Sequence, residues 1–324
     1  MPASTKLSDI LRDWMLPIAI VTGISIYLIY HFCPALHPAG KVLHVLAAEG
    51  QKTIISILMF FQFVKVSPHD LRFRRWHVMA LLFQIAAFIG FAALVYITRD
   101  ETTRILLECA MLCLICPTAS AAGVITEKLK GSLSETMSYL VLINTVATFL
   151  IPAVIPMVRP SDSYGFWQYV IRIGERIFPL LILPCLLAWL IRYTTHRLQR
   201  ILMRLSRYTF YIWGPGLMLA MVLSTRALLL SHLGIGSIFC IVLVSMGCCA
   251  VQFFAGRHFR GSRTERITAG QALGQKNTGF LIWLGYHYMT PVTSVAGGLY
   301  AIWQNLFNSW ELYRENHPDT TSSR

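Results

Sequence analysis

Lys276 is the residue of this sequence whose type and position point most clearly to chemistry. It lies in the run GQKNTG, well inside an otherwise apolar segment, and no Asp or Glu lies at an obvious partner position. A lysine in the middle of a membrane segment costs at least about 2.5 kcal/mol, so such a residue usually serves a function. The alternative is a lysine that extends its ammonium to the membrane interface. We interpret Lys276 as functional, either as a group that exchanges a proton or as a tethered cation.

A second polar interruption, CPTASAAG, occupies Cys116–Gly123 in another apolar segment. Pro117 cannot donate a backbone hydrogen bond and Gly123 tolerates unusual dihedrals, so we expect the helix to unwind here. Backbone groups that are freed within a membrane must line a polar cavity, to which Thr118 and Ser120 would add hydroxyl groups. The sequence therefore predicts a broken helix with a polar lining.

The run around Lys276 predicts a second broken helix. Within Gly274–Gly279, Asn277 and Thr278 supply side-chain donors and acceptors. The half-helix after each break would point its amides, and the positive end of its dipole, into the cavity. Two such ends that meet in mid-membrane predict a site for an anion. The alternative is a proline kink in one helix and a packing patch of glycines in the other.

Five other polar residues in apolar segments indicate less. Each can be a ligand or an interhelical hydrogen-bond partner, and the sequence leaves both readings open. They are Gln84, Asn144, Thr145, Gln304 and Asn305.

The eight cysteines indicate packing between helices. Nearly all lie in apolar runs, and the C-x-x-C pair of Cys113 and Cys116 has no second Cys or His pair at zinc-site spacing. The apolar segments also hold no paired Asp, no H-E-x-x-H and no Ser–His pair at useful helical spacing. We therefore expect neither an enzyme nor an organic cofactor, and we assign no metal site.

The composition places these motifs in a membrane protein. Of the 324 residues, 55% are hydrophobic and 13% are charged, against about 25% charged in average soluble domains. The apolar residues form blocks of about 20 residues, which are long enough to cross a bilayer. A net charge of +13 can indicate a nucleic-acid partner, but the basic residues lie in short loops beside apolar blocks, so no nucleic acid is expected. The ten predicted spans are 13–33, 45–64, 77–97, 105–127, 136–158, 173–192, 208–226, 235–256, 266–284 and 290–312.

The spans and their flanking charges predict a topology. Lys and Arg gather near both termini and in the loops after even-numbered spans, which places both termini in the cytoplasm. The halves 1–160 and 161–324 each hold five spans, an odd number, so homologous halves would form an inverted repeat. The fourth span of each half carries the break. Paired breaks of this kind are the best indication in a sequence of a transporter binding site.

With these features the sequence resembles the bile acid:sodium symporter family. The resemblance runs from about Leu58 to the end of the tenth span and is strongest at Cys116–Gly131, Asn277–Gly279 and Ala296–Asn305 (AGGLYAIWQN). It implies an all-α membrane protein of ten transmembrane helices, in which discontinuous helices four and nine cross. Spans 1, 2, 6 and 7 would form a panel subdomain, and spans 3–5 and 8–10 a core subdomain.

The resemblance also implies a function and a set of site residues. Family members carry organic anions such as bile acids, sulfated steroids and small carboxylates, usually with sodium, as core and panel move against each other. Gln84 matches a family glutamine near a sodium site. The implied substrate-binding residues are Thr118, Ser120, Asn277, Thr278 and Asn305.

Several positions that bind sodium in the family lack oxygen ligands in this chain. A Ser-Asn pair is replaced by Ala122 and Gly123, and a sodium-binding Glu is replaced by Ala272, with Gln271 beside it. The Gln of the family's Gln-Asn-Ser-Gly run is Lys276, whose ammonium at about 4 Å would oppose a bound cation by roughly 4 kcal/mol. The ion site, or what replaces it, is therefore assigned to Gln84, Gln271, Gln275 and Lys276.

We expect a secondary transporter of an organic anion, bile-acid-like or a small carboxylate, that is sodium-independent or proton-linked through Lys276. A conventional sodium-coupled symporter is the first alternative, in which Na⁺ would be the bound ion. A membrane receptor that binds its ligand without moving it is the second. The expected setting is a bacterial-type inner (plasma) membrane, crossed many times by a monomer whose partners are the anion and the lipid bilayer.

Overall fold

The computed structural model describes residues 7–119, 121–231, 233–259 and 261–316, most of which are helical. The prediction of an all-α protein is confirmed, and a helix or a pair of helices occupies each of the ten predicted spans. The α-helices are α1 Leu7–Phe32, α2 Gly40–Val64, α3 Arg75–Ile97, α4 Glu101–Ile115, α5 Ala122–Lys128, α6 Leu133–Val158, α7 Phe166–Leu181, α8 Leu183–Thr194, α9 His196–Leu205, α10 Thr209–Leu230, α11 Ile235–His258, α12 Arg263–Gly274, α13 Thr278–Tyr288 and α14 Ser294–Asn316. The short 3-10 helices are η1 Pro34–Ala39, η2 Pro68–Asp70, η3 Ser206–Tyr208 and η4 Pro291–Thr293.

Several helices have the length and composition of membrane spans. Six segments of the described chain pass that test, and α7 with α8, bent by 40°, make a seventh if they are taken as one span. Large apolar side chains on these helices face outward, as lipid-facing surfaces require. The chain is therefore a multi-pass membrane protein. The six segments are Met15–Phe32, Pro34–Val64, Arg75–Ile97, Leu133–Val158, Tyr211–Leu230 and Ile235–His258.

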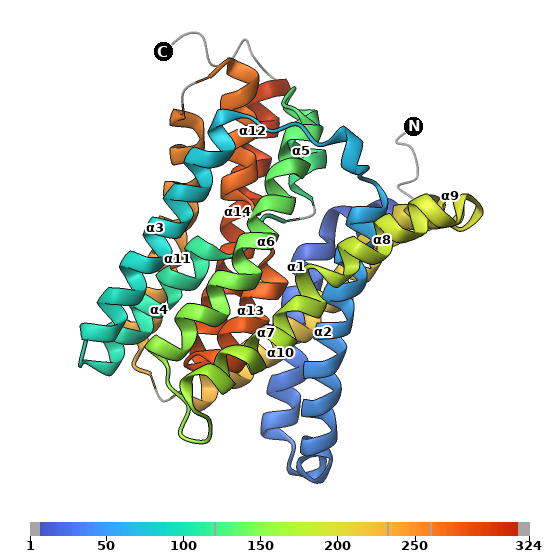
Figure 1. Cartoon of the computed structure of the whole chain (residues 1–324). Coiled ribbons are helices and arrows are strands. Elements are labelled where there is room, and N and C mark those ends of the chain that lie inside the picture. The colour runs from blue at the N-terminus through green and yellow to red at the C-terminus, as the bar shows by residue number, and fades with distance from the viewer. Residues whose placement is uncertain (1–6, 120, 232, 260, 317–324) are drawn as a thin grey trace.

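The helices form two groups by their contacts. In the first group α10 packs against α1 and α2, and α2 packs against α7 and α8. In the second group α3, α4, α5 and α6 pack with α11, α12, α13 and α14. The groups touch where α6 meets α7, and where α2 and α10 meet α13. In Figure 1, α1, α2 and α8 lie on the right and α3, α4, α11 and α12 on the left.

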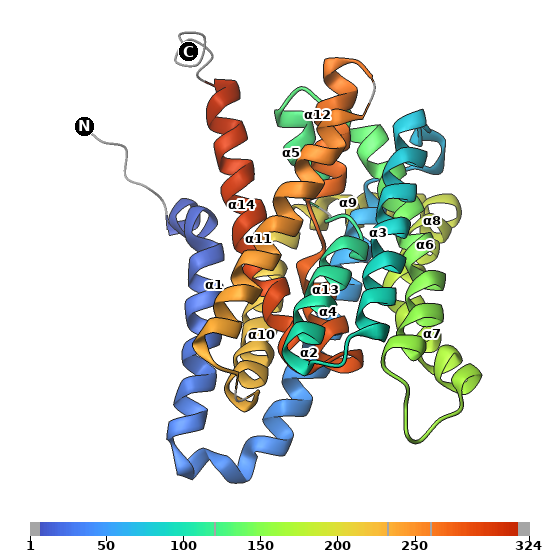
Figure 2. The ribbon, with the colours of Figure 1, turned by 90° about the vertical axis from the view of Figure 1, so that its left-hand side faces the viewer.

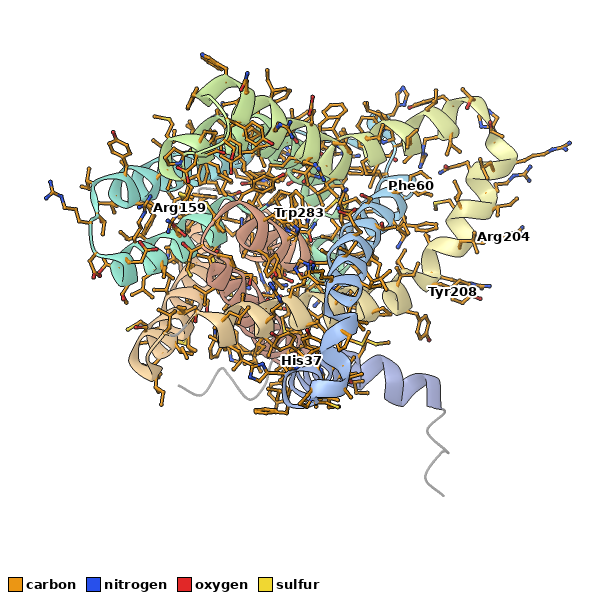
Figure 3. The ribbon with its side chains drawn as sticks, turned by 90° about the horizontal axis from the view of Figure 1, so that it is seen from below. His37, Phe60, Arg159, Arg204, Tyr208 and Trp283 are labelled. Atoms are coloured by element: carbon orange, nitrogen blue, oxygen red, sulfur yellow. The ribbon has the colours of Figure 1, made fainter. Side chains whose placement is uncertain are left out.

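Glycine allows the close approach of α11 and α12. A Cβ atom at Gly256 would lie 2.7 Å from the Cα of Gly270, so any larger residue must push the two backbones apart. The close packing positions the carboxyl end of α12, at Gly274, within the second group. Figure 3 shows Trp283 of the next helix, α13, near the middle of the bundle, whereas Arg204 of α9 lies at its rim.

The beginning of α1 and the end of α14 lie toward the same end of the molecule (Figures 1 and 2). The short helix α5 and the first turn of α12 also lie at this end. The described part of the chain therefore begins and finishes on one side of the bundle.

Candidate functional site

The two predicted helix breaks lie against each other in the second group. Residues 116–121 separate α4 from α5, and residues 275–277 separate α12 from α13. Thr118 and Lys276 form an antiparallel bridge between the two breaks. Backbone groups that leave both helices are thus paired with one another, as they must be away from water. The backbone hydrogen bonds run from Asn277 N to Pro117 O, 2.8 Å, and from Ala119 N to Gln275 O, 2.9 Å.

Lys276 is fully buried at this crossing. Its ammonium nitrogen, Nζ, has no hydrogen-bond partner among the described residues. A buried charge without a partner is costly, so the position favours a function that uses the charge. The titratable groups that interact with the ammonium are four thiols, those of Cys116, Cys113, Cys249 and Cys248.

The buried carboxylate of Glu108 serves a different part of the bundle. Its Oε1 atom is 2.6 Å from the guanidinium Nε of Arg159, and its Oε2 atom accepts a hydrogen bond from the amide of Thr290 at 3.1 Å. Glu108 therefore ties α4 to the end of α6 and to the segment before α14. It does not supply a counter-ion for Lys276.

Thr118 is at the crossing, as predicted, but its hydroxyl is already used. It is fully buried and donates a hydrogen bond to the carbonyl of Ala272 at 2.6 Å. The contact joins the first break to the last turn of α12. Ser120, also assigned to the substrate site, lies outside the described residues.

Asn277 and Thr278 form the beginning of α13. The Asn277 side chain accepts a hydrogen bond from the amide of Phe280 at 3.2 Å, which caps the helix. Thr278, the first residue of α13, is buried. The positive end of the α13 dipole therefore begins at the crossing, next to the buried ammonium.

In α14, Gln304 meets the break and Asn305 does not. The side-chain oxygen of Gln304 accepts a hydrogen bond from the backbone amide of Lys276 at 2.8 Å. The Asn305 side chain donates to the carbonyl of Ala301 in its own helix, at 2.7 Å. The sequence placed both residues in span ten, but the rotation of α14 about its axis turns Gln304, and not Asn305, toward the break.

Gln84 lies beside the first break, with both ends of its amide engaged. Its Nε2 atom donates to the carbonyl of Leu114, and its oxygen accepts a hydrogen bond from the hydroxyl of Tyr139. Both partners are buried in the second group of helices. The side-chain oxygen of Gln84, which would coordinate a cation, is thus already hydrogen-bonded to Tyr139.

Gln271 and Gln275 belong to a chain of buried polar groups along α12. Gln275 donates to the side-chain oxygen of Gln271, and Gln271 donates to Glu311 at 2.6 Å. Glu311 also forms an ion pair with Arg257, which is a third exposed. The chain leads from the crossing toward the end of the bundle where α11 and α14 finish. Ala122 and Gly123, the other positions that replace family sodium ligands, lie in the first turn of α5.

Gln51 is a site residue that sequence reasoning missed. It is fully buried in α2, of the first group, and donates a hydrogen bond to the carbonyl of Gly279 at 3.2 Å. Its own oxygen has no hydrogen-bond partner among the described residues. The available signal was a glutamine within the apolar span 45–64. Gln51 is the contact through which the first group reaches the crossing.

A second polar contact joins the two groups near the beginning of α2. The hydroxyl of Tyr286, in α13, is 2.8 Å from the Nε2 atom of His44, in α2. The same hydroxyl accepts a hydrogen bond from Arg226, in α10. We call His44, Tyr286 and Arg226 the intergroup triad.

The fold and site together define a multi-pass helical membrane protein whose two broken helices pair around a buried lysine. No family model matches this chain, and no curated protein matches it either. The geometry of its own residues therefore carries the functional argument.

Proposed function

We propose that this protein is a secondary transporter that carries an organic anion by alternating access. The observation that carries the proposal is the pairing of two unwound breaks around the fully buried, unpartnered ammonium of Lys276. A fixed positive charge beside the amino end of α13 would attract an anionic group. Unwound backbone at the middle of membrane helices is typical of transporter binding sites.

In this proposal ten spans form two inverted repeats, 1–160 and 161–324, with discontinuous helices four and nine. α4 with α5 would be span four, and α12 with α13 span nine. The first group of helices would be the panel (spans 1, 2, 6 and 7), and the second the core (spans 3–5 and 8–10). The contacts that divide the helices into these groups support this assignment, as does the resemblance to the bile acid:sodium symporter family.

Transport would come from motion of the core group against the panel group. Such a motion would have to break polar contacts that include those of Gln51 and the intergroup triad, and the hydrogen bond from Ser224 in α10 to the carbonyl of Ser294 in α14. Each is a single or paired hydrogen bond, which contributes about 0.5–1.5 kcal/mol, so breaking them would be compatible with rapid switching. The substrate would be a bile-acid-like anion or a small carboxylate, recognised near Thr118, Asn277 and Thr278.

We further propose that transport is independent of sodium, or linked to protons through Lys276. The ammonium would supply the positive charge that sodium provides in the family. The engagement of oxygens at Gln84 and Gln271 supports this, because each accepts a hydrogen bond from a neighbouring side chain. Sodium-coupled symport and ligand binding without transport are the two rivals. The membrane would be a cell inner membrane, with both termini in the cytoplasm.

Uptake into proteoliposomes tests the proposal. Purified protein is reconstituted, and accumulation of labelled taurocholate, estrone sulfate and succinate is followed with and without a sodium gradient, from pH 5 to pH 9. We expect saturable uptake of at least one anion that is unchanged by sodium and varies with pH. Lys276→Gln should flatten the pH profile, whereas Lys41→Gln, an equal charge change at an exposed position, should leave it intact.

The other outcomes separate the rivals. Uptake that requires a sodium gradient would show a conventional symporter and would contradict the role given to Lys276. Saturable binding to the detergent-solubilised protein without any flux would favour a receptor.

A further inference from the structure

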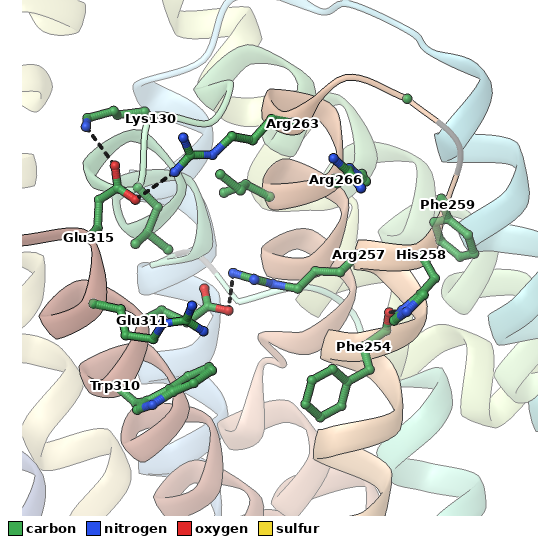
Figure 4. Close-up of a pocket in the computed structure, with 14 residues that line it drawn as sticks. Lys130, Phe254, Arg257, His258, Phe259, Arg263, Arg266, Trp310, Glu311 and Glu315 are labelled. Atoms are coloured by element: carbon green, nitrogen blue, oxygen red, sulfur yellow. Dashed lines mark hydrogen bonds and ion pairs between the residues drawn. The ribbon is translucent and has the colours of Figure 1, made fainter. Parts of the chain in front are cut away.

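A large pocket lies where four helices of the second group come to an end. It has a volume of about 930 Å³ and is bordered by the ends of α5, α11 and α14 and the beginning of α12. Figure 4 shows basic side chains around its upper part and Trp310 and Phe254 lower down. No residue of the crossing lines this pocket, so it is separate from the proposed transport site.

The pocket carries an excess of positive charge. Five Lys or Arg side chains line it, against two carboxylates, Glu311 and Glu315. An excess of three positive charges in a concave site attracts an anion strongly. The basic residues are Lys130, Arg257, Arg263, Arg266 and Arg314.

The internal ion pairs leave part of this charge uncompensated. Glu315 is shared by Lys130, at 2.7 Å, and Arg263, at 3.3 Å, and Glu311 pairs with Arg257. Figure 4 shows all three pairs. Arg266 and Arg314 have no ion pair among the described residues, and the Arg314 guanidinium lies 4.9 Å from the centre of the Trp310 ring. Arg314 also interacts electrostatically with Glu311, a carboxylate that Arg257 already pairs, so Arg266 and Arg314 are the basic groups least compensated within the pocket.

The backbone at Lys130 is unusual. It has a φ of 63°, the only positive φ among the non-glycine residues described. The left-handed conformation costs about 1 kcal/mol for such a residue, and glycine would adopt it more easily. A lysine at this position carries its side chain, which is 78% exposed, over the pocket. The left-handed residue ends α5, since the amides of Lys130 and Gly131 donate to the carbonyls of Glu127 and Thr126.

An apolar strip continues from the pocket along the outside of the bundle. Phe254 and Trp310 line the pocket, and about half of each side chain is exposed. Val251, one turn before Phe254 on α11, and Leu306, one turn before Trp310 on α14, are also exposed. The ring of Phe307 in α14 lies 6.0 Å from that of Phe254 and 5.4 Å from that of Trp310, so the exposed apolar side chains of α11 and α14 meet across the contact between the two helices.

We propose that this pocket binds the phosphate headgroup of an anionic phospholipid, with the acyl chains along the strip formed by Val251, Phe254, Leu306 and Trp310. A basic pocket directly above an exposed apolar strip matches both parts of such a lipid. A soluble phosphate compound shares the headgroup chemistry but would make no use of the strip. The pocket lies at the end of the bundle where the described chain begins and finishes.

Lipid retention and thermal stability test this proposal on the full-length protein. The protein is purified in a zwitterionic detergent, and phosphatidylglycerol, cardiolipin or phosphatidylcholine is added while bound lipid is counted by native mass spectrometry. We expect both anionic lipids, but not phosphatidylcholine, to bind saturably and to raise the melting temperature. The double variant Arg266→Gln/Arg314→Gln should weaken this binding by about thirtyfold.

The matched control is Arg72→Gln/Arg75→Gln, which removes two exposed arginines, one just before α3 and one at its first residue, at the same end of the bundle. It should bind anionic lipid as the wild type does. Equal weakening by both double variants would overturn the proposal, because it would show a general charge effect. Equal binding of phosphatidylcholine and phosphatidylglycerol would overturn it too.

A titration with soluble phosphate compounds distinguishes a lipid ligand from a free phosphate compound. Glycerol 3-phosphate and inorganic phosphate are titrated at the same concentrations, and we expect at least tenfold weaker binding than for phosphatidylglycerol. Comparable binding would overturn the lipid assignment.

A second variant, Lys130→Gly, removes one cation while relieving the left-handed backbone, so it should fold normally. It should bind phosphatidylglycerol about fivefold more weakly than the wild type. An unchanged affinity in this variant would contradict the role of Lys130.

Discussion

The two helix breaks are maintained in different ways. The first lies at 116–121 and contains Pro117, which cannot complete a helical hydrogen bond wherever it is placed. The second lies at 275–277 and contains no proline; its open backbone is held by contacts from Thr118, Pro117 and Gln304. The first break thus contains a residue that disfavours a helix, whereas the second contains no proline and is held by the first break and by α14.

The breaks also differ in charge. Side chains of the first break are uncharged, and the hydroxyl of Thr118 donates a hydrogen bond to the carbonyl of Ala272. The second break contains Lys276, buried and unpartnered among the described residues. In the proposed function the first break would contribute backbone and hydroxyl groups, and the second the charge that binds an anion.

Replacing Lys276 should give the largest effect. Lys276→Met keeps a long unbranched side chain but removes the charge, so we expect anion uptake to fall at least a hundredfold. The same change should stabilise the folded protein by about 2.5 kcal/mol or more, because the cost of burying the charge disappears. Initial uptake rates and melting temperature in detergent measure the two effects. A variant that loses activity because it is less stable would mean that Lys276 is structural.

The packing that positions the second break should give the next largest effect. Gly256→Ala forces α11 away from α12 and should cost about 1–3 kcal/mol. Gly90→Ala, in the middle of the long helix α3, meets nothing within 4 Å and should be neutral or slightly stabilising. Thermal unfolding in the same detergent compares them. Similar losses in both variants would contradict the close packing seen at Gly256.

Substitutions at two adjacent residues of α14 should show that a direct hydrogen bond to the second break stabilises the protein more than a position close to it does. Gln304→Ala leaves the amide of Lys276 without its acceptor and should cost about 1–3 kcal/mol. Asn305→Ala removes only a bond within α14 and should cost about 1 kcal/mol or less. The melting temperatures of the two variants show which substitution costs more stability. If Asn305 proved the more costly, the observed rotation of α14 would be wrong.

The smallest expected effect concerns the hydrogen bonds that cap the first turns of α4 and α12. The hydrogen bond from Thr103 to Asp100, which caps α4, lowers the pKa of that carboxyl group. Its contribution to stability is therefore complete above the pKa of the unfolded chain and is lost as pH falls through the lower folded value. The amide of Glu265, at the start of α12, donates instead to the hydroxyl of Ser262, which does not titrate, while the Glu265 carboxylate accepts a hydrogen bond from the amide of Ser262.

Hydrogen exchange checks this contrast. The protection factor of the Thr103 amide should fall as the pH is lowered below about 4, the ordinary pKa of an Asp carboxyl group, whereas that of the Glu265 amide should change less. Asp100→Asn, which keeps a capping side chain without a titratable group, should remove the pH dependence at Thr103. Parallel loss at both amides would indicate general acid unfolding.

The helices were predictable because their signals are local. Long apolar blocks placed a helix at every expected span, and Pro117 marked the first break within a residue or two. The second break was found through Lys276, because a charge in an apolar run is visible without a structure. Gln51 and Gln304 were not assigned to the site, since an amide in a span has the same pattern whether it faces a site or a packing partner.

By itself the sequence determined that this is a helical membrane protein, that two of its helices break, and that one break carries a charge. These features follow from apolar run length, from the missing amide of Pro117 and from the desolvation cost of Lys276. Only the tertiary structure decided that the breaks pair with each other, that Gln304 meets Lys276 where Asn305 does not, and that Gln51 reaches the crossing from the other group. Such contacts depend on helix rotation and on the approach of segments far apart in the chain, which no local pattern encodes.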